Sequence, residues 1–438
     1  MKIKNSKALA VSPTRERLLQ IAEAGLEAID TERVVAEKIG LRGNELKIGD
    51  RFFDLEQGKR IFVVGVGKCS LEAAGALQKV LKDKITDGVV IDLRKGKLEK
   101  IRTFSGTHPL PTEENVSATK EVIKLLEKSE KDDLIIFLIS GGGSTLLCQP
   151  KEHTCAAEAE LIKCLYSGGA TIEEVNTVRK HISLARGGNL AKYAYPSEVV
   201  ALIFSDVPGN DLSFVASGPT VPDATTVGDA ERILTKYKAW ENCGISQNSL
   251  IETPKEKKYF ERVSNILFVS NKIALEAMAA EAEKLGYAPA IRSSNLQGEA
   301  SEVGKNLVEE LHRAASGMIL LYGGETTVVL WQGGPPQWGE ARPTGLGGRN
   351  QELALSALRF IESGEAVVAL ASDGEDNTDM AGAICDKITR EKAKEKGLKP
   401  EKYLEEHDSY NFFAASGDQI STGKTGSNVS DLIIALKE

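Results

Sequence analysis

Two glycine-rich segments in the first half of the chain carry residues that could bind an anion. Lys68 follows Gly65 and Gly67 in "FVVGVGKCS", and "LISGGGSTLL" runs from Ser140 through three glycines to Ser144. Bare backbone N–H groups and a nearby positive charge both suit a phosphate or a carboxylate. The alternative for the glycine run is a tight turn that serves packing alone.

Neither segment matches a complete nucleotide-binding motif. The first has two glycines of the dinucleotide pattern G-x-G-x-x-G, but Ser70 stands at the third position, although Asp92 ends the next apolar run. The second lacks the lysine of a phosphate-binding Walker loop, and "GDQISTGKT" near the C-terminus is one residue out of register for that motif. A nicotinamide site is therefore a weak alternative.

Three aspartates are candidates for holding a metal ion or accepting a proton. Asp206 and Asp211 lie in "SDVPGNDLS", and Asp373 opens the acidic stretch "DGEDNTD" after another apolar run. Carboxylates are common Mg²⁺ ligands and general bases. Aspartates in such Gly/Pro loops are also frequent turn-formers, so both interpretations stay open.

A second positive group, Arg349, lies in "PTGLGGRNQELAL" in the C-terminal half. The flanking glycines predict that its guanidinium is unobstructed, and its planar fork of donors suits phosphate or carboxylate. His108 and His181 have no serine or cysteine arranged with them for nucleophilic catalysis, so we interpret both as structural. Glycine-rich loops, a lysine, an arginine and several aspartates together are typical of a kinase.

The elements that must position these residues alternate between strand and helix. Apolar runs before Gly65, after Asp87, at 134–139 and at 198–204 predict buried strands, separated by helices that include 113–130 and one from Thr171 to Gly187. Such alternation predicts an α/β fold, with a parallel sheet covered by helices on both faces. Ligands bind at the carboxyl ends of such strands, where Gly65, Gly141 and Asp206 would lie.

A second α/β region follows the polar stretch 241–262, with strands predicted at 317–322, 326–331 and 366–371. The chain has 438 residues and a formal charge of −8, which argues against a nucleic-acid partner. No apolar run has the length of a membrane span and no signal peptide is visible, so we expect a cytoplasmic protein. None of the six cysteines forms a C-x-x-C pair, which favours reduced thiols.

Eight motifs, in order along nearly the whole chain, resemble the glycerate 2-kinase family with the MOFRL C-terminal domain. They are "GVGK", "THPLPTEEN", "SGGGSTLL", "EVNTVRKHISLARGGNLA", "SDVPGNDLSFVASGPTVPD", "GGETTV", "GLGGRNQE" and "TGSNVSDL". The resemblance implies phosphorylation of the 2-hydroxyl of D-glycerate with ATP and Mg²⁺ or another divalent cation. It also implies a Rossmann-like N-terminal domain over 1–255, a smaller α/β MOFRL domain over 256–438, and an active site in the cleft between them.

The resemblance also assigns roles to residues of the shared motifs. Lys68, Arg349 and Asp206 are the expected catalytic residues, and Asp206, Asp211 and Asp373 the expected metal ligands. The residues expected to bind substrate or phosphate are Gly65, Gly67, Ser140, Gly141, Gly142, Gly143, Ser144, Arg179, Glu325 and Asn350.

Two other functions remain open on the sequence. Some relatives have been called hydroxypyruvate reductases, so an NAD(P)-dependent reductase is the first alternative. A regulator that binds a nucleotide or hydroxy acid without turnover is the second. The sequence does not fix the oligomeric state, and a homodimer is one expectation.

Overall fold

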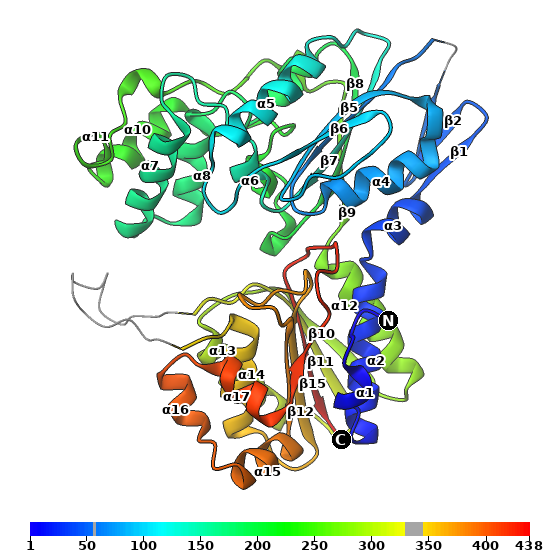
Figure 1. Ribbon diagram of the computed structural model, residues 1–438, viewed down its shortest axis with the longest axis vertical. Coiled ribbons are helices and arrows are strands. Elements are labelled where there is room, and N and C mark those ends of the chain that lie inside the picture. Colours follow the sequence, from blue (N-terminus) through cyan, green and yellow to red (C-terminus); the bar gives the residue numbers. More distant parts are fainter. Residues whose placement is uncertain (56–57, 329–344) are drawn as a thin grey trace. The chain divides into compact units, whose positions relative to one another are not determined.

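The computed structural model describes residues 1–55, 58–328 and 345–438, and within them the chain forms two compact units. The parallel-sheet unit comprises Thr31–Val269, and the mixed-sheet unit comprises Met1–Asp30 together with Ser270–Glu438. Figure 1 shows the elements of both.

The parallel-sheet unit is built on six parallel strands in the order β6-β5-β4-β7-β8-β9. Numbered along the chain within this sheet, the order is 3-2-1-4-5-6, that of the doubly wound fold, with its switch point between β4 and β7. This topology confirms the predicted Rossmann-like sheet. The strands are β4 (Ile61–Val66), β5 (Ile85–Asp92), β6 (Ile101–Ser105), β7 (Leu134–Ser140), β8 (Glu198–Phe204) and β9 (Val263–Val269).

The two central strands are buried over their whole length, as their unbroken apolar runs predict. Val64 of β4 pairs with Phe137 of β7, and Val66 with Ile139, so both strands end together at the carboxyl edge. The loops after β4 and β7, which carry Lys68 and the glycine run, therefore start side by side.

Helix α8 begins as predicted but ends earlier. Thr171 and Glu174 form the expected capping box, whereas the helix stops at His181 instead of continuing to Gly187. The following residues leave the helix because they bond other loops: Leu184 N donates to Gln149 O and Gly187 N to Ser217 O. The unit's helices are α3 (Thr31–Lys38), α4 (Ser70–Leu81), α5 (Glu113–Leu126), α6 (Gly143–Leu146), α7 (Cys155–Ser167), α8 (Ile172–His181), α9 (Asn189–Ala194), α10 (Val227–Lys236) and α11 (Ala239–Asn242).

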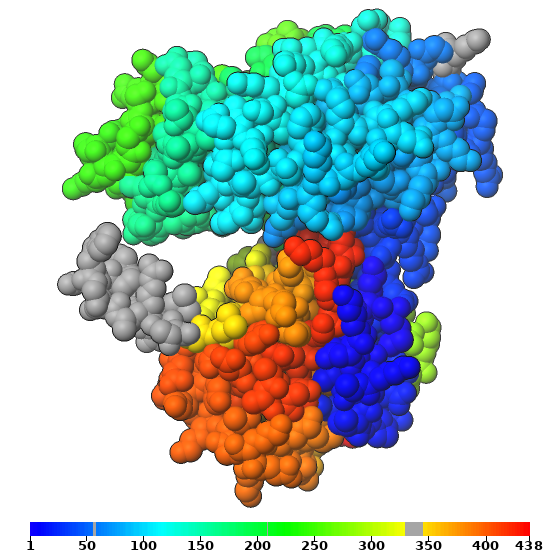
Figure 2. Space-filling model, in the orientation of Figure 1, coloured from blue at the N-terminus to red at the C-terminus, as the bar shows by residue number. Residues whose placement is uncertain are grey.

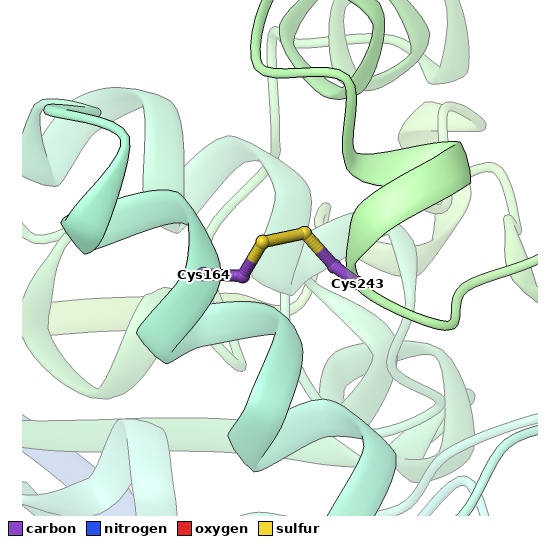
Figure 3. The surroundings of a disulfide bond; sticks show 2 residues. All are labelled: Cys164 and Cys243. Atoms are coloured by element: carbon purple, nitrogen blue, oxygen red, sulfur yellow. A yellow bond between two sulfur atoms is a disulfide. The ribbon is translucent and has the colours of Figure 1, made fainter.

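Two features of this unit were not predicted. A small antiparallel sheet of β1 (Ile39–Arg42), β2 (Glu45–Ile48) and β3 (Arg51–Asp54) precedes β4. A disulfide joins Cys164 of α7 to Cys243 after α11, 79 residues away (Figure 3). The prediction of reduced thiols is therefore wrong for this pair, because folding brings together two cysteines that no local spacing relates.

The mixed-sheet unit has six strands in the order β10-β11-β15-β12-β13-β14, and only β10 and β11 are parallel. Predicted strands at 317–322 and 366–371 correspond to β11 and β12. In the predicted strand at 326–331, residues 326–328 form no strand and 329–331 lie outside the described residues. The strands are β10 (Ala288–Leu296), β11 (Met318–Gly324), β12 (Glu365–Ala371), β13 (Gly382–Asp386), β14 (Gln419–Ile420) and β15 (Asp431–Lys437).

The N-terminal helices pack within this unit, as the dark blue residues beside orange and red ones show (Figures 1 and 2). Arg15 of α2 is fully buried and donates to Asp386 at 2.7 Å and to Asp418 at 2.6 Å. The contacts thus place residues 1–30 in one unit with residues 270–438, whereas the prediction divides the chain once, between residues 255 and 256. The unit's helices are α1 (Ser6–Leu9), α2 (Pro13–Ala28), α12 (Asn271–Lys284), α13 (Ala300–Arg313), α14 (Arg349–Phe360), α15 (Lys387–Glu395), α16 (Pro400–Glu405) and α17 (Ser409–Ser416).

No helix in the described part of the chain is long and apolar enough to cross a membrane.

Candidate functional site

The loops after β4 and β7 interlock at the switch point of the parallel sheet. Lys68 N donates to Gly141 O at 2.9 Å. Gly67 has φ +127°, and a Cβ there would lie 2.1 Å from Ser140 Oγ. The G-x-G segment therefore needs glycine at this position for contact with the neighbouring loop.

Each glycine of the run has its own structural reason. A Cβ on Gly141 would lie 1.6 Å from Asp206 Oδ2, and one on Gly143 would lie 2.5 Å from Ala216 Cβ. Gly142 adopts the left-handed conformation, φ +79°, as the N-cap of the four-residue helix α6. Close packing therefore accounts for Gly141 and Gly143. The same packing places the Asp206 carboxylate against the backbone of Gly141.

Lys68 and His108 both lie beside Gly142. A Cβ on Gly142 would be 3.1 Å from Lys68 Cγ and 3.5 Å from His108 Cδ2. The residue His108 is exposed, yet partial burial of its ring, followed by the charges of Lys68 and Arg179, lowers its pKa to about 4. The imidazole is therefore neutral near pH 7 and lies in the electrostatic field of two cations.

Neither of these cations is compensated within the described part of the chain. Lys68 Nζ and the Arg179 guanidinium have no hydrogen-bond or ion-pair partner there, and Arg179 Nε is buried without one. Burial and the charge of Arg186 lower the pKa of Arg179. An uncompensated lysine beside a glycine-rich turn, with a second uncompensated cation acting on the same histidine, makes this edge of the sheet suited to an anion.

A strained turn closes the other side of the glycine run. Ala216 and Ser217 have φ values of +52° and +59°, which non-glycine residues rarely adopt. Ser217 Oγ donates to Ser144 Oγ at 2.9 Å. Strain of this kind is held only where surrounding contacts require it, and it is common at binding sites.

The three aspartates predicted as metal ligands lie in different surroundings. Asp206 is partly buried beside Gly141, whereas Asp211 is exposed and accepts from Ser213 N at 2.9 Å, as a turn-former does. Asp373 belongs to the mixed-sheet unit and accepts from Glu375 N at 3.1 Å. In the ranges that the structure describes, no three His, Cys, Asp or Glu side chains group as a metal site. The shared metal site of these aspartates stays a prediction.

Arg349 is not unobstructed, contrary to the prediction from its glycine context. Its Nε and Nη2 donate to the two oxygens of Asp431 at 2.6 and 2.9 Å, and Nη1 lies 3.2 Å from Glu325 Oε1. These carboxylates raise the pKa of Arg349 despite burial. The flanking glycines serve the loop instead: a Cβ on Gly348 would lie 1.9 Å from Asp376 O.

Asn350 is buried in the same network, at 1% exposure. Its Nδ2 donates to Asp376 Oδ1 at 3.1 Å and to Asp431 Oδ1 at 2.9 Å. Burial, followed by the charge of Asp431, raises the pKa of Asp376 to about 6. This placement makes Asn350 a link between two buried carboxylates at the start of α14.

A pocket of about 420 Å³ opens beside Arg349 within the mixed-sheet unit. His407 Nδ1 lies 2.8 Å from Glu352 Oε1 in its wall. No local sequence pattern predicts this pair, because its members are 55 positions apart. The residues that line the pocket include Glu325, Thr326, Thr327, Arg349, Glu352 and His407.

Comparison with known proteins identifies the family. Residues 17–252 match the family described as "Domain of unknown function (DUF4147)", and residues 318–431 match the MOFRL family. The chain is 38% identical to a glycerate 2-kinase of Pyrococcus horikoshii, over 96% of this chain and 97% of that protein. The chain belongs to the MOFRL-containing glycerate kinase family.

Two further relatives bear on the fold and on the function. The crystal structure of a glycerate kinase from Thermotoga maritima matches with a TM-score of 0.83 at 33% identity, over 97% of this chain and 99% of that one. A putative hydroxypyruvate reductase of Agrobacterium vitis is 37% identical over 85% of this chain and 86% of that protein. Relatives of this chain are therefore named for two different activities, a kinase and a reductase.

Proposed function

We propose that this protein is an ATP-dependent kinase that phosphorylates the 2-hydroxyl of D-glycerate and gives 2-phosphoglycerate and ADP. The observation that carries the proposal is the uncompensated charge of Lys68 at the switch point of a doubly wound sheet, together with a second uncompensated cation, Arg179, that acts on the neighbouring His108. Relatives named glycerate 2-kinase supply the substrate.

In this proposal the parallel-sheet unit binds the negative groups of the reaction. Negative charge on the transferred oxygens and the leaving group must be stabilised during phosphoryl transfer, and Lys68 supplies an unpaired charge for it. The loop from Ser140 to Ser144 and Arg179 hold a phosphate or the glycerate carboxylate. His108, being neutral, can accept or donate one hydrogen bond in the same place.

Asp206 fits a role toward Mg²⁺ or toward the hydroxyl proton. Mg²⁺ in kinases is held by one or two carboxylates together with substrate phosphates, so a single well-placed aspartate is sufficient. The Asp206 carboxylate lies against the Gly141 backbone, at the same sheet edge as Lys68. The ion would supply charge neutralisation of the phosphates when bound.

Arg349 would act from the mixed-sheet unit. Asp431 grips its Nε and Nη2, which fixes the plane of the guanidinium. Its Nη1 contacts Glu325, which is half exposed, so this is the donor that a phosphoryl oxygen would take over. In the proposed catalytic role, Arg349 would keep its two contacts with Asp431 and exchange its contact with Glu325 for one with the phosphoryl group.

The reductase is the second candidate, because relatives bear that name. A dinucleotide site of the doubly wound fold uses an acidic residue at the end of the second strand to bind ribose. Asp92 holds that position, but it is 1% exposed and accepts from Leu71 N at 3.0 Å in the first turn of α4. Because Asp92 is buried and bonded to α4, it is not available to a ribose, which favours the kinase over the reductase.

One assay separates the candidates. Purified protein is incubated with ATP, Mg²⁺ and D-glycerate, and the products are resolved by ³¹P NMR; a parallel reaction contains hydroxypyruvate and NADH or NADPH. We expect ADP and 2-phosphoglycerate in the first and no nucleotide oxidation in the second. Formation of 3-phosphoglycerate alone would correct the position of transfer, and reduction of hydroxypyruvate without ATP turnover would replace the kinase by the reductase.

A further inference from the structure

A buried ion pair that the proposed function does not use acts electrostatically on Arg179. The side chain of Arg186 is fully buried and that of Glu158 is 2% exposed, and Arg186 Nη2 lies 2.8 Å from Glu158 Oε1. Glu158 comes from α7, and Arg186 from the loop that follows α8. The contact is short but poorly aligned, since no nitrogen of Arg186 makes a hydrogen bond of good geometry within the described residues.

The charges in this cluster do not balance. Arg186 and Glu158 both act electrostatically on Arg179, the first lowering and the second raising its pKa. His153 lies 4.0 Å from Glu158 and has a lowered pKa through burial, so it is neutral near pH 7. Cys148 Sγ lies 3.5 Å from Glu158 Oε2, and burial keeps it a thiol. Two guanidinium groups therefore lie in the field of one carboxylate, and only Arg186 pairs with it.

We infer that Arg186 is a positioning residue, which occupies Glu158 and thereby leaves Arg179 unpaired toward the anion site. The arrangement explains why Arg179, with a carboxylate in its surroundings, forms no ion pair in the described structure. Arg186 itself cannot touch a ligand, because its side chain has no accessible surface. Its effect on an anion must pass through Arg179.

The consequence concerns the loss of Arg186. A carboxylate left buried without a partner is costly, and Arg179 is the guanidinium at hand to replace Arg186. The new ion pair would neutralise Arg179 and withdraw its donors from the anion site. If the Glu158 charge is removed together with Arg186, no carboxylate competes with the ligand for Arg179, so Arg179 should bind the ligand again.

The test measures binding of inorganic phosphate to the full-length protein by isothermal titration calorimetry at low ionic strength. Relative to the wild type, Arg186→Met should weaken phosphate binding about tenfold or more, the scale of one charged hydrogen bond. The double variant Glu158→Gln/Arg186→Met should return to within about threefold, and Arg186→Lys should also bind well. Near-UV circular dichroism establishes that each variant is folded.

Several outcomes would overturn the inference. These are a double variant as weak as Arg186→Met, wild-type affinity in Arg186→Met, or a wild type that does not bind phosphate. If Arg186→Met does not fold, the single variant Glu158→Gln decides, because its Arg179 has no competing carboxylate and must keep phosphate affinity; loss of binding in folded Glu158→Gln contradicts the inference.

The inference relies on the proposed function only for the identity of the natural anion. Phosphate binding with the rescue pattern, but no turnover of ATP with glycerate, would leave the inference standing and remove the kinase. An active kinase in which Arg186→Met raises the KM for glycerate, while the double variant shows no rescue, would keep the kinase and remove the inference.

Discussion

Lys68 and Arg349 occupy similar local positions with opposite surroundings. Lys68 lies in the turn before α4, and Arg349 is the first residue of α14, each after a glycine-rich segment. Lys68 has no carboxylate partner among the residues the structure describes, whereas Arg349 is gripped by Asp431 and contacts Glu325. The same local pattern therefore produces an uncompensated charge in one unit and an ion-paired charge in the other.

Glycines before a basic residue signal close approach of backbone, but they do not tell whether a ligand or a protein carboxylate meets the charge. For Arg349 the decisive partner is Asp431, which lies 82 residues further along the chain. The two residues should consequently respond to mutation in different ways.

The largest effect on stability is expected for Arg349→Ala. The change leaves Asp431, which is 1% exposed, without its guanidinium, so the free energy of unfolding should fall by about 3–5 kcal/mol. Urea denaturation followed by far-UV circular dichroism measures it. Arg349→Ala/Asp431→Ala should be more stable than the single variant, since the buried charge is gone. A single variant as stable as the wild type would contradict a stabilising ion pair between Arg349 and Asp431.

Lys68→Ala should have the largest effect on activity. Loss of a charge that acts on the transferred phosphoryl group should lower kcat roughly 10²-fold or more, which corresponds to about 3 kcal/mol. The free energy of unfolding should change by less than about 0.5 kcal/mol, because no ion pair is broken. Steady-state kinetics with ATP and D-glycerate and the same denaturation experiment test both parts.

Lys79→Ala is the control, since Lys79 lies on α4, the helix that follows Lys68, with a side chain 70% exposed and only an exposed ion pair to Glu32. It should have wild-type kinetics. Near-normal kcat in Lys68→Ala would remove Lys68 from the mechanism, and a large loss of stability would mean that its charge is compensated after all.

A smaller effect is expected for Gly142→Ala, which tests whether the glycine run holds the site around Lys68. The left-handed backbone at φ +79° should cost about 1–2 kcal/mol of stability, and the methyl group would press on Lys68 Cγ. Gly169→Ala provides the control, because its φ is +83° and no atom lies within 4 Å of the added carbon. Both variants should lose similar stability, but only Gly142→Ala should raise KM or lower kcat. Equal kinetics in both variants would limit Gly142 to a role in folding.

The smallest effect is a change in the titration of His108. Its pKa of about 4 lies below the ordinary 6.5, so the unfolded chain binds more protons between these values, and His108 lowers stability as the pH falls from 6.5 to 4. Lys68→Ala removes one of the charges that depress the pKa and should raise it. NMR titration of the imidazole measures the pKa in the wild type and in Lys68→Ala. An unchanged value would place Lys68 further from His108 than the structure does.

Much of the fold and part of the site followed from local patterns. The apolar runs of β4 and β7, the capping box at Thr171 and the loops at the sheet's carboxyl edge are short-range features, and the structure contains them. The grouping of Lys68 with the glycine run followed from the rule that parallel strands end together. Arg186 and Glu158 were missed because an ion pair between an α7 residue and a distant loop has no local signature.

The sequence by itself determined the α/β class, the family and which loops meet at the carboxyl edge of the sheet, because these depend on periodicity and on motifs within a few residues. Only the tertiary structure decided which charges are compensated, that residues 1–30 pack with 270–438, and that Cys164 meets Cys243. Charge compensation depends on distances of a few ångströms between side chains from remote segments. Those distances exist only after the chain has folded.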